Sequence, residues 1–112
     1  MSKAWAITPK KIQAAVERVV KVSHPRQVIL FGSAACGRKR TPNDIDLLIV
    51  SRRDVESPRK ESVRIRRALR GIMMPMDILV ISEQRLCELA HQPGLVYREA
   101  LREGRVVYEA AP

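Results

Sequence analysis

The feature that most constrains the fold is the alternation of short apolar runs with helical segments. Residues 28–31, 44–50 and 76–81 are runs of strand length, which predicts buried strands. Apolar residues recur at helical spacing in residues 9–23, 58–70, 82–90 and 95–102, and a last short strand is predicted over 106–108. This order predicts one α/β (α+β) domain over residues 1–112, a small mixed sheet with helices on one or both faces.

The helix boundaries carry their own signals. Thr8 precedes Pro9 and Ser57 precedes Pro58, which is the pattern of an N-cap followed by proline at the first helical position. Pro25 is expected to end the first helix, because a residue that precedes proline disfavours the helical conformation.

Composition narrows the classes of protein. The chain has 112 residues and 46% apolar residues, which indicates a globular domain rather than a disordered segment. Its net charge of +9 favours an anionic partner, which could be nucleotide phosphates, nucleic acid or an acidic protein surface. Cys36 and Cys87 have no zinc-site spacing, residues 1–7 lack a signal-peptide core, and no apolar run approaches the ~18 residues of a membrane span. We therefore expect a cytoplasmic protein with reduced thiols and no membrane partner.

Three carboxylates in apolar surroundings are the candidate metal ligands. Asp44 and Asp46 lie two residues apart at the start of a strand, so their side chains should share one face, roughly 6–7 Å apart. Such a pair is costly without a cation, and a divalent metal is the usual remedy. Asp77 stands in a second apolar run, and if that strand is a neighbour, all three carboxylates meet. They could then hold two Mg²⁺ ions about 4 Å apart.

Gly32 and Ser33 follow the first predicted strand and are the candidate nucleotide-binding residues. Glycine lets the backbone turn sharply and approach a ligand closely, and the following N–H groups can hold phosphate oxygens. Taken alone, this pair is usually a turn, Asp44 is more often a strand-start or turn residue, and Asp77 could pair with a surface arginine. The combination of the glycine turn with three strand carboxylates is far more specific than its parts.

Residues 32–37 and 43–48 resemble the signature of the minimal nucleotidyltransferase (MNT) family, within the polymerase-β-like nucleotidyltransferase superfamily. Residues 76–79 resemble its third-carboxylate strand, and residues 101–109 resemble its usual ending. The resemblance implies the polymerase-β-like fold, ATP as donor, Mg²⁺ as cofactor and transfer of a nucleoside monophosphate. By position, Gly32 and Ser33 would bind the triphosphate, Asp44 and Asp46 would hold both metal ions, and Asp77 would hold one and help deprotonate the acceptor hydroxyl.

The chain departs from the family pattern at two positions. Cys36 stands where the family often has arginine and Asn43 where it often has serine, and neither change removes a predicted metal ligand. The predicted catalytic core takes up nearly the whole chain, which suggests that a partner supplies the acceptor. The family resemblance implies a helical HEPN-type ribonuclease as that partner, with this chain as the antitoxin that modifies a tyrosine on the toxin.

Two other functions remain open at this stage. The chain could be a non-catalytic antitoxin or binding module that masks a partner or holds a nucleotide. It could also bind nucleic acid through charge, although it lacks a set of aromatic residues for base stacking. The second predicted helix carries a cluster of basic residues: Arg59, Lys60, Arg64, Arg66, Arg67 and Arg70. These residues form either a solvated face or a site for an acidic or nucleic-acid partner.

Overall fold

The computed structural model describes residues 6–31, 45–52, 57–89 and 104–111. In chain order the elements are α1 (Pro9–Ser23), β1 (Gln27–Phe31), β2 (Ile45–Ser51), α3 (Pro58–Ala68), β3 (Met76–Ser82), α4 (Glu83–Leu89) and β4 (Arg105–Glu109). The predicted α/β class is confirmed, and the strands over residues 28–31, 44–50, 76–81 and 106–108 are each found within one or two residues of their expected bounds. The helix predicted over residues 95–102 lies outside the described residues.

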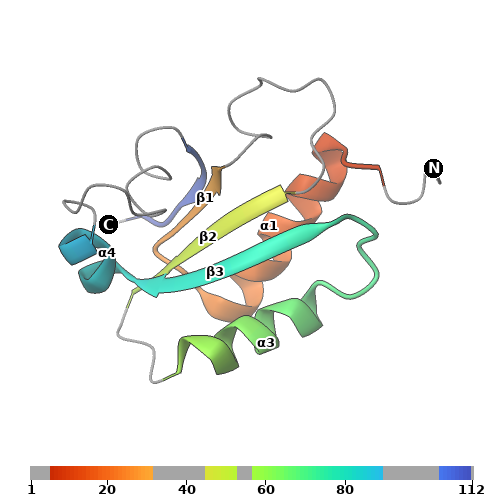
Figure 1. Ribbon diagram of the computed structural model, residues 1–112. Helices are drawn as coiled ribbons and strands as arrows, with labels where there is room; N and C mark the ends of the chain where they lie inside the picture. The colour runs from red at the N-terminus through yellow and green to blue at the C-terminus, as the bar shows by residue number, and fades with distance from the viewer. Residues whose placement is uncertain (1–5, 32–44, 53–56, 90–103, 112) are drawn as a thin grey trace.

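The four strands form one mixed sheet in the order β3-β2-β1-β4 (Figure 1). β2 is parallel to β3 and antiparallel to β1, and β4 pairs with the other side of β1 in antiparallel orientation. β2 and β1 are therefore the inner strands, which explains why β2 is buried at every position except Asp46 and apolar from Leu47 to Val50.

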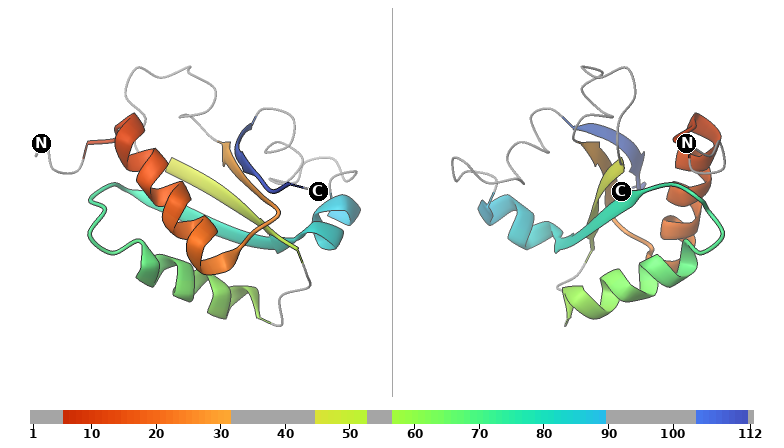
Figure 2. Two further views of the ribbon diagram at one scale, coloured as in Figure 1. Left: turned by 180° about the vertical axis from the view of Figure 1, so that it is seen from behind. Right: turned by 45° about the vertical axis from the view of Figure 1, so that its right-hand side comes forward.

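The two faces of the sheet are covered differently. Alternate residues of β2, such as Ile45 and Leu47, pack in the larger core with Val19 of α1 and Ile65 of α3. The other set, such as Leu48, packs in a smaller core that α4 contributes to. Figure 2 shows α1 and α3 side by side on one face of the sheet, with α4 at the carboxyl end of β3.

The predicted helix starts are confirmed in detail. The Thr8 hydroxyl accepts a hydrogen bond from the Lys11 N–H at 3.2 Å, and the Ser57 hydroxyl accepts one from the Lys60 N–H at 3.3 Å. α1 ends where the sequence predicts, and there His24 adopts a left-handed backbone with φ of 48° and its N–H donates to the Val20 carbonyl at 3.0 Å. The helix is therefore closed by a left-handed residue as well as by the proline that follows.

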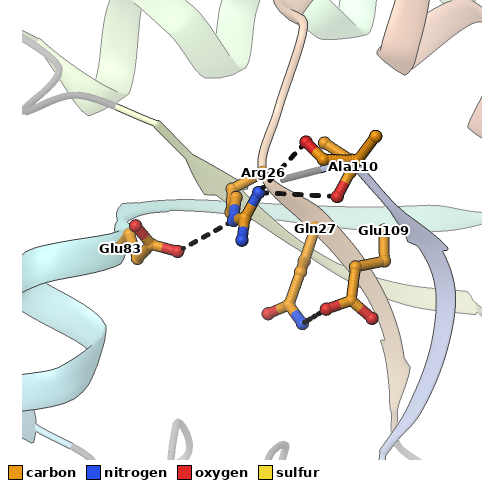
Figure 3. A network of polar contacts seen from close by, with 6 residues as sticks. Arg26, Gln27, Glu83, Glu109 and Ala110 are labelled. Carbon is orange, nitrogen blue, oxygen red and sulfur yellow. Dashed lines mark hydrogen bonds and ion pairs between the residues drawn. The ribbon is translucent and has the colours of Figure 1, made fainter.

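Arg26, at the start of β1, joins three distant segments (Figure 3). Its Nε lies 3.2 Å from Oε2 of Glu83 in α4, and its Nη1 donates to the Ala110 carbonyl at 3.4 Å. Its backbone N–H donates to the Val50 carbonyl at 2.7 Å, and its own carbonyl accepts from the Ala110 N–H at 2.9 Å. The sequence gives no sign of this role, because the partners lie 57 and 84 residues away.

Among the described residues, no helix combines the length and the apolar character that crossing a bilayer requires.

Candidate active site

Asp46 and Asp77 occupy adjacent positions on neighbouring strands. In the parallel pairing of β2 with β3, the Cα of Asp46 is the partner of the Cα of Asp77. Neighbouring strands lie about 4.8 Å apart, and residues in register on parallel strands point to the same side of the sheet. The fold thus brings together two carboxylates that are separated by 30 residues of chain.

These two carboxylates lie on the face of the sheet opposite α1 and α3. Asp46 alternates with Ile45 and Leu47, which belong to the core under α1 and α3, so its side chain points the other way. Asp77 likewise precedes Ile78, which packs in that same core. Asp46 is half-buried and Asp77 is exposed, so both side chains keep contact with solvent on that face.

The backbone that carries the pair is held firmly. Ile45 and Leu47 on either side of Asp46 are fully buried, and Ile78 after Asp77 is 4% exposed. The Ile45 N–H donates to the Pro75 carbonyl at 2.9 Å, which continues the pairing of the two chain segments to the start of β2. These packed strands fix the backbone positions from which the two carboxylates extend.

The carboxyl end of β1 lies beside Asp46. Phe31, the last residue of β1, is the antiparallel partner of Asp46 and packs with the smaller core on the face opposite α1 and α3. In the sequence, Gly32 and Ser33 follow Phe31 directly. Gly32, Ser33 and Asp44 themselves lie outside the described residues, so their predicted roles stay predictions.

The acidic pair suits a hard divalent cation, because carboxylate oxygens are the ligands that Mg²⁺ prefers. The described residues contain no group of three or more acidic, histidine or cysteine side chains that could hold a metal ion. Asp44, the third predicted ligand, lies outside the part of the chain that the structure describes. The described geometry therefore provides two of the three predicted ligands on one face.

Comparison with known families decides the class of protein. The family described as "Polymerase beta, Nucleotidyltransferase" matches residues 10–112. The chain belongs to this nucleotidyltransferase family. Among solved structures, it is similar to a protein of Sulfolobus solfataricus with a provisional nucleotidyltransferase assignment, with a TM-score of 0.62 and 22% identity over 89% of this chain and 78% of that chain. That likeness shows the shared fold. No significant match was found among curated proteins.

Family membership confirms the predicted superfamily and its fold, and it makes nucleotidyl transfer the general chemistry of the chain. The narrower assignment to the MNT family, the donor ATP and the HEPN-type partner stay predictions. Sequence reasoning singled out Asp46 and Asp77 but did not foresee Phe31 as the neighbour of Asp46, because that contact depends on the antiparallel register of β1 with β2.

Proposed function

We propose that this chain is a Mg²⁺-dependent nucleotidyltransferase that moves AMP, or another nucleoside monophosphate, from an NTP to an acceptor hydroxyl. The observation that supports it most is the pairing of Asp46 with Asp77 in register on the sheet face opposite α1 and α3. Two carboxylates in register on neighbouring strands suit a shared divalent cation, which supports catalysis more than simple masking of a partner. The family match supplies the reaction class.

The proposed roles follow from the positions of the residues. Asp44, Asp46 and Asp77 would hold two Mg²⁺ ions, which supply neutralising charge to the phosphates and lower the pKa of the attacking hydroxyl. Gly32 and Ser33 would bind the triphosphate through backbone N–H groups and the serine hydroxyl. Asp77, the more exposed of the described pair, would take the acceptor proton while the acceptor oxygen bonds to the α-phosphorus. The bond from that phosphorus to the bridging oxygen breaks, and pyrophosphate leaves.

The acceptor is proposed to come from a second chain. The family match assigns residues 10–112 to the nucleotidyltransferase domain, which supports a protein acceptor that binds to this domain from outside. A helical HEPN-type toxin with an accessible tyrosine hydroxyl would complete the reaction, and this chain would then act as its antitoxin.

Transfer can be tested with NTP labelled at either the α- or the γ-phosphate, mixed with the chain and a co-purified partner. We expect label on the partner from α-labelled NTP alone, loss of transfer in EDTA and recovery with excess Mg²⁺. Transfer from the γ-position would indicate a kinase instead. A partner that is bound and inhibited without any label would favour the non-catalytic antitoxin, and transfer that persists in EDTA would exclude the metal site.

A further inference from the structure

The solvent side of α3 is a continuous cationic surface, which we call the α3 basic surface. It comprises five basic residues of the helix and one just after its end: Arg59, Lys60, Arg64, Arg66, Arg67 and Arg70. At about 100° of rotation per residue, the five helical cations span an arc of about 160°. Ile65 and Leu69 face the core on the opposite side, at 0% and 5% exposure. The exposed half of the helix is thus almost entirely basic.

Few carboxylates neutralise this surface. Glu61 is the acidic residue of α3, and one of its oxygens lies 3.5 Å from Nη1 of Arg64. Arg64 also donates from Nη2 to the Val22 carbonyl at 2.8 Å, which ties α3 to the end of α1. Within residues 6–31, 45–52, 57–89 and 104–111, the other five basic side chains form no ion pair. Like charges at this density repel each other unless an anion binds between them.

The surface is shaped as well as charged. Ser57, Arg59, Lys60, Val63, Arg64 and Arg67 line a shallow groove of about 660 Å³. Arg66 and Arg70 line a second groove of about 310 Å³ between the end of α3 and the start of β3. α3 packs on the sheet face opposite Asp46 and Asp77, on the same side of the sheet as α1 (Figure 2).

The residue types of the α3 basic surface favour a polyanion over a protein as its partner. Val63, 44% exposed, is the exposed large apolar side chain of α3, whereas the centre of a protein interface is apolar and depleted of charge. The helix has no aromatic residue for base stacking and no Asn or Gln for reading base edges. Cations repeated on successive turns suit the repeated charges of a phosphate backbone.

We propose that the α3 basic surface docks the sugar–phosphate backbone of a nucleic acid without sequence preference, on the side of the domain away from the nucleotidyl-transfer site. This docking is independent of nucleotidyl transfer, so the protein would bind nucleic acid even if it transferred no nucleotide.

The test uses fluorescence anisotropy with labelled RNA and DNA duplexes of random sequence. The variant R59Q/K60Q/R67Q removes three cations whose side chains make no described hydrogen bond, and it leaves Arg64 in place. We expect the affinity for nucleic acid at low salt to fall more than about tenfold. The plot of log association constant against log salt concentration should become less steep by about 2.7, at about 0.9 for each of the three lost phosphate contacts.

The matched control removes the same charge elsewhere. Lys10, Arg85 and Arg105 are exposed residues of α1, α4 and β4, and K10Q/R85Q/R105Q also lowers the net charge by three. The proposal expects this control to keep most of the affinity, and D46N to keep all of it. Equal losses in the two triple variants would show attraction by net charge alone and overturn the proposal. Competition by polyglutamate as effective as by RNA or DNA would also overturn it, in favour of an acidic polypeptide partner.

Discussion

Replacing Asp46 by asparagine is expected to lower the rate of nucleotidyl transfer about a thousandfold, because losing about 4 kcal/mol of transition-state stabilisation corresponds to that factor. The change removes one negative charge and keeps the shape of the side chain. Asp46 is half-buried between fully buried neighbours, so its backbone position should not change. The rate is measured as label transferred per unit time from α-labelled NTP.

The control for this variant is Glu17→Gln, which neutralises an exposed carboxylate of α1 on the opposite face of the sheet. The Glu17 carboxylate accepts from Gln13 Nε2 at 3.3 Å, and the oxygen of a glutamine at that position can still accept this bond. Glu17→Gln should retain the full rate. A D46N protein that transfers nucleotide as fast as the control would show that this carboxylate has no part in the reaction.

Replacing Leu47 by alanine is expected to cost about 2–5 kcal/mol of unfolding free energy, the range for a buried leucine cut to alanine. Leu47 is fully buried in the inner strand β2 and packs in the core that α1 and α3 share. A domain of this kind has about 5–15 kcal/mol in total, so the loss would be a large part of its stability. Denaturant unfolding followed by circular dichroism measures it.

Val106→Ala is the comparison for this core variant. Val106 is 48% exposed on β4, a strand at the edge of the sheet, so truncating it should cost much less. The fold positions Asp46, so the L47A variant should lose nucleotidyl transfer at the same denaturant concentration at which it unfolds. A Leu47→Ala cost below about 1 kcal/mol would mean that the core is not packed around β2 as described.

The elements of the fold were predictable from the sequence because their signals are local. Thr8 and Ser57 mark helix starts through a cap and a following proline, and the structure shows both caps. The strand of Asp46 could be recognised by its apolar character on both faces, which is typical of an inner strand covered on both sides. These patterns need only neighbouring residues, and they therefore do not depend on the tertiary structure.

The arrangement of the strands was not predictable in the same way. The prediction could state only that Asp77 would meet Asp46 if their strands were neighbours. The register that makes Asp46 and Asp77 partners, and the placement of β4 beside β1 through a strand pairing with Tyr108 opposite Val28, depend on how distant segments pack. Arg26, whose ion pair with Glu83 spans 57 residues, was missed for the same reason.

Whether Asp46 and Asp77 hold divalent ions can be tested directly by Mn²⁺ binding, measured by electron paramagnetic resonance in the presence of a non-hydrolysable NTP analogue. If Asp46 and Asp77 share divalent ions beside the nucleotide, the wild-type chain should bind Mn²⁺, and both Asp46→Asn and Asp77→Asn should weaken that binding while Glu17→Gln leaves it unchanged. Equal Mn²⁺ affinity in all four proteins would contradict the proposed metal site.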